Sequence, residues 1–230
     1  MTTITRNLQD VRERIATACQ SAGRDVQEVT LLAVSKTFGP DAVRQAAAAG
    51  QLAFGENYIQ EALDKMATLR DLPLQWHCIG PIQSNKSRLV AEHFDWAHTV
   101  DRLKIAERLS AQRPAGLAPL NVCIQVNIDG GPTKSGVLPE HALALAREVA
   151  ALPHLRLRGL MTIPEIAPDF EAAHAVHTSA RALFDHISAE GLALDTLSMG
   201  MSADLDAAIA AGSTMVRVGS AIFGARAAKG

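Results

Sequence analysis

The sequence has few cysteines, few aromatic residues and no long apolar run, and its charges almost cancel. The cysteines Cys19, Cys78 and Cys123 are scattered and include no C-x-x-C pair, which argues against a disulfide framework or a zinc knuckle and suits a reducing compartment. No apolar run reaches membrane-spanning length, and the polar N-terminus is unlike a secretory signal peptide. A formal charge of −2 at pH 7 gives no reason to expect nucleic acid or a membrane as a partner. We therefore expect a cytoplasmic protein.

What the chain does have is a regular alternation of short apolar runs and alanine-rich helical segments. Its 230 residues and 48% hydrophobic content are enough for a well-buried core. After a first amphipathic helix that ends near Gly23, the pattern predicts strands over 30–36, 52–57, 75–80, 96–101, 121–128, 155–163, 196–200 and 214–224. It predicts helices between them over 40–49, 59–69, 85–94, 102–112, 139–152, 170–190 and 203–211.

This order predicts an α/β fold, a single (β/α)8 TIM-type barrel with an extra N-terminal helix. Strict strand–helix alternation indicates parallel strands covered by helices. Eight strands fit a closed barrel, for which about 250 residues is typical. The alternative is an open doubly wound sheet, which ranks lower because no G-x-G-x-x-G opens a helix. No linker or low-complexity tract divides the chain, so we expect one domain over residues 1–230.

Two loops near the C-terminus are candidates for binding an anion. In barrels of this kind the loops after the seventh and eighth strands often bind phosphate. The first offers Ser198, Gly200 and Ser202 before a helix, and the second offers Gly219 and Ser220. Each loop alone is also explained as a plain Gly/Ser turn. Together, at these two positions, they favour an anion site.

Two cations are expected at the same end of the barrel. Alternation in "TMVRVGS" points Arg217 inward, where it makes either a structural salt bridge or a ligand contact. Lys36, directly after the apolar run "LLAVS", shares a face with Leu32 and Val34. Burial and a nearby arginine disfavour an ammonium and favour a nucleophilic amine. Lysine, arginine and an anion site suit pyridoxal phosphate. A Schiff-base aldolase acting on a sugar phosphate stays open.

Several motifs together resemble one known family. "AVSKT", "FGENYIQEA", "WHCIGPIQSNK", "TKSG", "GLMTI", "LSMGMSAD" and "VRVGSAIFGAR" are similar to those of the pyridoxal phosphate homeostasis proteins, which resemble the N-terminal barrel of alanine racemase. The resemblance covers nearly the whole chain. It implies pyridoxal phosphate held as a Schiff base on Lys36, its phosphate contacted by Ser202, Gly219 and Ser220, and Arg217 near the pyridine nitrogen. It also implies Asn57 close to the cofactor.

The resemblance further implies a role in intracellular pyridoxal phosphate and vitamin B6 homeostasis, with effects on amino-acid balance. We expect a monomeric carrier or regulatory protein that has no catalytic residues and binds no metal, and whose possible partners are apo forms of pyridoxal-phosphate enzymes. An arginine at the ring nitrogen weakens the cofactor as an electron sink, and the only tyrosine is Tyr58. A weak amino-acid racemase is the alternative. Among other residues, we expect a hydrogen-bonded His77 on its strand, and His174 and His177 on a solvated helix face.

Overall fold

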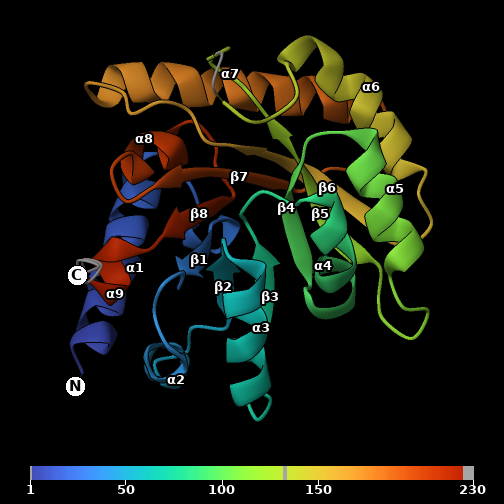
Figure 1. The fold of residues 1–230 in the computed structure, drawn as a ribbon. Coiled ribbons are helices and arrows are strands. Elements are labelled where there is room, and N and C mark those ends of the chain that lie inside the picture. Colours follow the sequence, from blue (N-terminus) through green and yellow to red (C-terminus); the bar gives the residue numbers. More distant parts are fainter. Residues whose placement is uncertain (1, 132–133, 225–230) are drawn as a thin grey trace.

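Eight parallel strands close into a barrel in the computed structural model, which describes residues 2–131 and 134–224 (Figure 1). Each strand pairs with the next along the chain, and β8 pairs with β1 to close the ring. The strands are β1 (Thr30–Val34), β2 (Ala53–Glu56), β3 (Gln75–Cys78), β4 (Trp96–Val100), β5 (Leu120–Val126), β6 (Leu155–Thr162), β7 (Thr196–Met201) and β8 (Met215–Val218). The predicted closed barrel is confirmed, and the open-sheet alternative is wrong.

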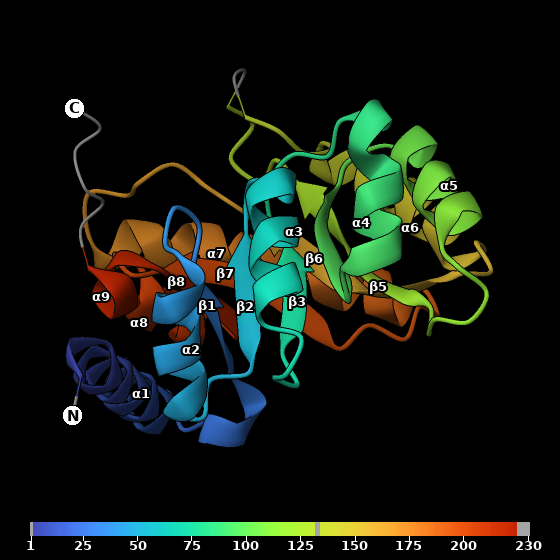
Figure 2. The ribbon, with the colours of Figure 1, turned by 60° about the horizontal axis from the view of Figure 1, so that its bottom comes forward.

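One α-helix follows each of the first seven strands and covers the outside of the barrel (Figures 1 and 2). These are α2 (Pro40–Ala48), α3 (Ile59–Thr68), α4 (Ser87–His93), α5 (Leu103–Gln112), α6 (Pro139–Ala150), α7 (Phe170–Ala189) and α8 (Leu205–Ala210). Two short 3-10 helices, η1 (Val26–Glu28) and η2 (Ser84–Lys86), precede β1 and α4. Of the motifs quoted above, Thr133 in "TKSG" and Ala225 and Arg226 in "VRVGSAIFGAR" lie outside the described residues.

The extra N-terminal helix α1 (Thr3–Ser21) packs against α8 and against the last helix, α9 (Ser220–Phe223). Its first turn is capped by the Thr2 hydroxyl, which accepts from the backbone N–H of Thr5. Its buried stripe has the helical spacing predicted from the sequence and consists of Leu8, Val11, Ile15, Ala18 and Cys19. Helix α1 therefore lies beside the part of the barrel that holds both predicted anion loops.

The last strand is shorter than predicted. The sequence predicts a strand over 214–224, but β8 ends at Val218. Gly219 leaves the extended conformation with φ −114° and ψ −80°. The N–H groups of Ile222 and Phe223 then donate back to the Gly219 carbonyl at 2.9 and 3.0 Å, which forms the short helix α9. The apolar residues of this stretch are thus buried by a helix rather than by a strand.

Side chains on the two faces of the strands build two different environments. Outward-facing residues such as Ala33, Phe54 and Val216 pack with the helices into the main core. The interior has two small apolar clusters, one of Leu32, Val34, Ala53, Ile79 and Met215, the other of Trp96, Cys123 and Met161. The rest of the interior includes buried polar side chains, where barrels of this type are filled by branched apolar residues; these are His77, His98, Ser198 and Arg217.

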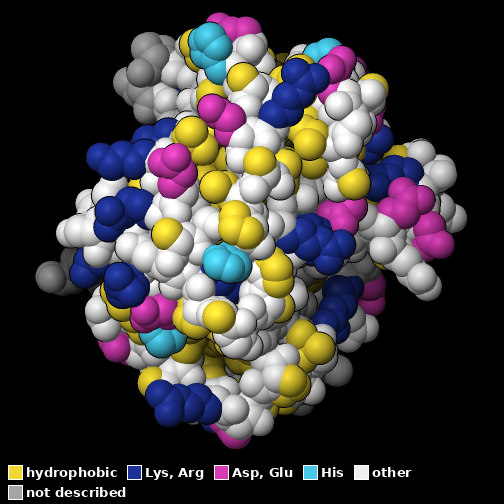
Figure 3. All heavy atoms as spheres, turned by 90° about the vertical axis from the view of Figure 1, so that its right-hand side faces the viewer, with side chains coloured by type: hydrophobic (Ala, Val, Ile, Leu, Met, Phe, Trp, Pro, Cys, Tyr) yellow, Lys and Arg dark blue, Asp and Glu magenta, His cyan; other side chains and the backbone are white. Residues whose placement is uncertain are grey.

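Charges of both signs are mixed on the surface that Figure 3 shows. On this face, around α5 and α6, Lys and Arg side chains are interspersed with Asp and Glu. This face has no extended field of one sign that would attract a polyanion. Over residues 2–131 and 134–224, no helix combines the length and the apolar character needed to cross a bilayer.

Candidate functional site

Lys36 lies in the turn that leaves the carboxyl end of β1, and its side chain is half-buried. Leu32 and Val34 of this strand pack in the barrel interior. Ser35 is buried on the other side, where it contacts α3 and β2. Lys36 follows these residues in the turn after the strand, and its interior orientation stays a prediction from strand alternation. Lys36 is thus at the carboxyl end of the barrel, where barrels of this type hold their functional residues.

The turn after β8 approaches the end of β1 closely. Ala33 is the register partner of Val218, so the two strands end side by side. A Cβ atom on Gly219 would lie 3.2 Å from the Val34 carbonyl oxygen and 3.4 Å from the Val34 Cβ. A side chain at position 219 would therefore press against the strand that leads to Lys36. The absence of one brings Gly219 and the exposed Ser220 beside the carboxyl end of β1.

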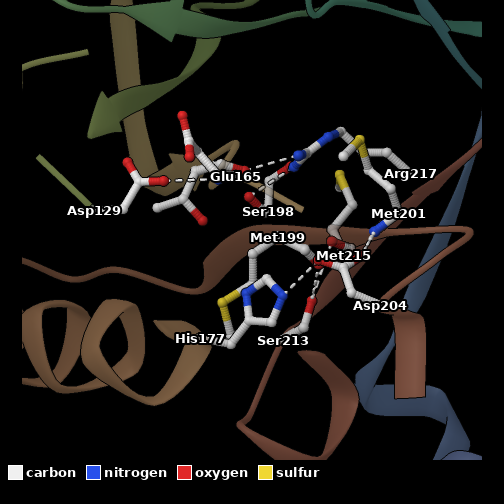
Figure 4. A network of polar contacts seen from close by, with 11 residues as sticks. Asp129, Glu165, His177, Ser198, Met199, Met201, Asp204, Ser213, Met215 and Arg217 are labelled. Atoms are coloured by element: carbon white, nitrogen blue, oxygen red, sulfur yellow. Dashed lines mark hydrogen bonds and ion pairs between the residues drawn. The ribbon is translucent and has the colours of Figure 1, made fainter. Parts of the chain in front are cut away.

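The other predicted anion loop, between β7 and α8, contains the half-buried Ser202. Gly200 has φ +92°, and a Cβ there would lie 2.4 Å from the Ala208 Cβ, so only glycine fits this bend. Asp204 fastens the loop, because its Oδ1 accepts from the Met201 N–H at 2.7 Å (Figure 4). The predicted loop residue Ser198 lies elsewhere. It is fully buried within β7 and takes no part in this turn.

His177 fastens the same loop from helix α7, and its predicted solvated position is wrong. It is 1% exposed, and its Nε2 lies 2.8 Å from Asp204 Oδ2 (Figure 4). Although burial opposes it, the hydrogen bonds from His177 and from the Met201 N–H lower the pKa of Asp204. Spacing along the helix could not reveal this contact, because the partner lies in a different element.

Helix α1 holds both loops from outside the barrel. Arg14 Nη1 donates to the Ser202 carbonyl at 2.7 Å, and its Nε and Nη2 bind the Asp206 carboxylate at 2.6 to 3.2 Å. Asn7 Nδ2 donates to the Ile222 carbonyl in α9 at 2.9 Å. These backbone contacts are between residues about 190 to 215 positions apart, and sequence periodicity within α1 gave no sign of them.

Arg217 points into the barrel, as predicted, and is only 4% exposed. Its Nη1 donates to the Ser198 carbonyl and hydroxyl at 2.8 and 2.9 Å (Figure 4). Its Nη2 donates to the Thr162 carbonyl at 2.8 Å. All three acceptors are neutral. Burial lowers the pKa of Arg217 to about 10, so the guanidinium is charged at neutral pH.

The structural salt bridge weighed for Arg217 is not formed by any described residue. A guanidinium has five N–H donors. The three bonds above leave one Nη2–H and the Nε–H without an acceptor among the residues that the structure describes. Arg217 is thus a buried cation with donors remaining for a ligand.

A chain of hydrogen bonds runs from Arg217 through the barrel interior. Ser198 Oγ lies 3.0 Å from His98 Nδ1, and His98 Nε2 lies 2.9 Å from His77 Nδ1. His77 Nε2 lies 3.0 Å from Gln75 Oε1, at the exposed amino end of β3. The prediction that His77 is a hydrogen-bonded interior histidine is confirmed. Nothing in the sequence connected it to His98, which alternation also puts inside.

The donor and the acceptor of each hydrogen bond in this chain follow from Gln75. Gln75 Oε1 can only accept, so His77 donates from Nε2 and accepts at Nδ1. His98 must then donate from Nε2 and accept at Nδ1 from the Ser198 hydroxyl. Both rings are neutral. Burial and the Arg217 charge lower the pKa of His98 to about 3, and burial lowers the pKa of His77 well below its usual value. The Ser198 oxygen is thereby left to accept from Arg217.

Asn57, at the end of β2, has a buried Oδ1 that makes no hydrogen bond to any described residue. Its backbone lies against Gly80, where a Cβ would come 2.1 Å from the Asn57 carbonyl oxygen. An unpaired buried amide oxygen is costly. Asn57 therefore has hydrogen-bonding capacity at the carboxyl end of its strand, as Arg217 has in β8.

A separate cavity of about 280 Å³ lies between residues 164–170 and residues 201–207. Its lining includes Met201 and Asp204 but not Lys36, Arg217 or Gly219. It contacts the β7–α8 loop without containing the residues that the sequence singled out.

Comparison with known proteins identifies the family of the chain. The family described as "Alanine racemase, N-terminal domain" matches residues 6–227. A curated relative from Pseudomonas aeruginosa, named pyridoxal phosphate homeostasis protein, is 61% identical over 226 residues, covering 98% of this chain and 97% of its own. The Escherichia coli protein of that name is 53% identical over 229 residues, covering 98% of both chains.

A solved structure extends the comparison to a bound molecule. PipY of Synechococcus elongatus, whose structure is described as having PLP bound, is 39% identical. It superposes with a TM-score of 0.80 over 91% of this chain and 100% of its own. On sequence and on fold, the chain belongs to the alanine racemase N-terminal domain family and, within it, to the pyridoxal phosphate homeostasis proteins.

Proposed function

We propose that this protein binds pyridoxal phosphate as a Schiff base on Lys36 and stores or delivers it in intracellular vitamin B6 homeostasis, with effects on amino-acid balance. The observation that carries the proposal is Arg217, a buried cation with neutral partners and remaining donors at the mouth of a barrel whose relatives carry the cofactor's name. In this proposal Arg217 donates to the pyridine nitrogen, and Ser202, Gly219 and Ser220 contact the phosphate.

The residues present fit this cofactor. Lys36 follows β1, and Gly219 packs without a side chain against Val34 of that strand. The turn that carries Lys36 and one of the two loops therefore leave the barrel side by side. The unpaired Asn57 Oδ1 offers an acceptor beside the cofactor. When bound, pyridoxal phosphate supplies an aldehyde for the amine and a conjugated ring that accepts electrons.

Arg217 favours a carrier over an enzyme. A guanidinium does not give up its proton, so it binds an unprotonated pyridine nitrogen, which withdraws electrons less than a protonated one. Its partners Ser198 and Thr162 are neutral and supply no carboxylate that would protonate the ring. A racemase also needs a base on each face of the substrate carbon. Tyr58, the only tyrosine, is 56% exposed.

The proposal is tested by transfer. Protein loaded with pyridoxal phosphate is mixed with an apo pyridoxal-phosphate enzyme, and enzyme activity is followed against an equal concentration of free cofactor and against a trap for released cofactor. We expect activation that the trap does not abolish. Activation no faster than leakage into solution would count against delivery. Stereoinversion in a panel of amino acids would favour the racemase instead. Absence of any bound cofactor, in the protein as purified and after loading, would overturn both.

A further inference from the structure

A buried network of charged side chains lies directly beneath the Lys36 turn. Lys65 of α3, which lies in front of β2 and β3 in Figure 2, places its Nζ 2.7 Å from Glu56 Oε1 and 2.7 Å from Glu61 Oε1. The same Nζ donates to the Ser35 carbonyl at 2.7 Å. Lys65 is 3% exposed and Glu56 is 1% exposed. The sequence pattern of this helix gave no sign that a lysine faces the barrel.

The network holds the residues on both sides of Lys36. Before it, the Ser35 carbonyl accepts from Lys65, and the Ser35 hydroxyl donates to Glu56 Oε1 at 2.5 Å. After it, the Thr37 N–H donates to Glu61 Oε1 at 2.6 Å. Because Glu61 also binds Lys65, the ammonium and two carboxylates fix the backbone immediately before and after Lys36.

The backbone in this turn is unusual as well. Thr37 has φ +69°, and it is the one non-glycine residue with positive φ among the described residues. This left-handed conformation is unfavourable for a β-branched side chain and persists only where surrounding contacts enforce it. Two hydrogen bonds enforce it here: the Thr37 N–H donates to Glu61 Oε1, and the Phe38 N–H donates to the Ser35 carbonyl at 3.1 Å. The turn is therefore held in a conformation that it would not adopt alone.

Stability does not account for such a network. Charged side chains lose hydration on burial, and a well-packed apolar cluster of the same volume is commonly as stable. Burial raises the pKa of Glu56, although Lys65 and Ser35 oppose this. One Glu56 oxygen, Oε2, is buried without a hydrogen bond to any described residue. The network instead fixes the geometry of the Lys36 turn, because three of its hydrogen bonds end on Ser35 and Thr37.

We propose that Lys65, acting with Glu56 and Glu61, is a positioning residue that sets the backbone of the Lys36 turn so that the amine meets the cofactor aldehyde. This inference rests on the proposed function, because it assumes that Lys36 is the attachment site. It predicts that the network governs covalent attachment and has little influence on the phosphate contacts, which come from β7 and β8. Lys65 touches neither cofactor nor reacting atoms.

Two ligands separate these effects. Pyridoxal phosphate reports attachment plus the phosphate and ring contacts, and pyridoxine phosphate lacks the aldehyde and reports only the phosphate and ring contacts. The variants are Lys65→Met, Glu61→Ala and Glu61→Gln. Of the two changes at Glu61, only Glu61→Gln keeps an oxygen that can accept from the Thr37 N–H. Gln60→Ala is the matched control, at an exposed neighbouring position of α3.

We expect Lys65→Met and Glu61→Ala to weaken Schiff-base formation at Lys36 by about tenfold or more, since each loses a hydrogen bond to a charged group. Glu61→Gln and the control should stay within about threefold of the parent, and all variants should bind pyridoxine phosphate like the parent. Should Lys65→Met fail to fold, Glu61→Ala at its 33% exposed side chain decides the matter. Unchanged attachment in Glu61→Ala, or an equal loss for both ligands, would overturn the inference. A parent protein that binds neither ligand would instead refute the proposed function.

Discussion

The histidine chain that supports Arg217 predicts a specific loss of stability in mild acid. His98 is fully buried, and both its ring nitrogens are engaged, by His77 and by Ser198. Its pKa is lowered to about 3, by burial first and by the Arg217 charge second, from an ordinary value of 6.5. When the pH is below that ordinary value, His98 is protonated in the unfolded chain and stays neutral in the folded chain. Stability is therefore lost as the pH falls from about 6.5 toward about 3.

The size of this loss follows from the interval between the ordinary pKa and the pH of the measurement. At about pH 5 that interval is about 1.5 units, and one unit corresponds to about 1.4 kcal/mol. His98 should thus contribute a loss of about 2 kcal/mol between about pH 7.5 and about pH 5. His77, whose pKa is also lowered, adds a loss of the same sign. Against a total stability of about 5 to 15 kcal/mol this is readily measured.

The assay is urea unfolding of the cofactor-free protein at the two pH values, because bound cofactor would add its own contribution. The variant His98→Gln removes one titrating ring and should lose about 2 kcal/mol less than the parent over this interval. His93→Gln makes the same replacement at an exposed position of α4 and is the control. If the parent and His98→Gln lose the same free energy, the buried neutral chain is refuted.

Two further predictions concern the anion loops. Replacing Arg14 by Met removes the hydrogen bond to the Ser202 carbonyl and should weaken binding of pyridoxine phosphate by about threefold to tenfold. The control Arg12→Met on the same helix should leave this binding unchanged, because Arg12 donates to the Ala49 carbonyl instead. Equal affinities in titrations of both variants would contradict the role of α1. Gly200→Ala forces a Cβ to within 2.4 Å of Ala208 at φ +92° and should lower stability by about 2 kcal/mol or more in urea unfolding; a fully stable variant would show that the bend is not constrained.

Much of the fold was readable from the sequence, because strand and helix signals alternate strictly and Gly and Pro mark their ends. Strand alternation also predicted that Arg217 faces the interior. The same reasoning extended β8 too far, since an apolar run such as 220–223 reads alike whether a strand or a short helix buries it. The turn at Gly219 decides that this stretch forms a helix and not a strand.

Periodicity could not predict which side chains from different elements bond to one another. His177 was predicted on a solvated helix face because the sequence shows no third metal ligand near His174 and His177, yet its partner Asp204 lies in the β7–α8 loop. Nothing in the sequence singled out Lys65, whose burial depends on Glu56 from a neighbouring strand. In each case the burial depends on a contact between residues in different elements, which neither composition nor spacing encodes.

The most direct test of the account is the chemical identity of the cofactor attachment. The protein is incubated with one equivalent of pyridoxal phosphate, reduced with borohydride, digested, and mapped by mass spectrometry. We predict a pyridoxyl group on the peptide that contains Lys36, and competition by pyridoxine phosphate. Labelling only of other lysines, or none at all, would contradict the assignment of the barrel mouth as the pyridoxal phosphate site.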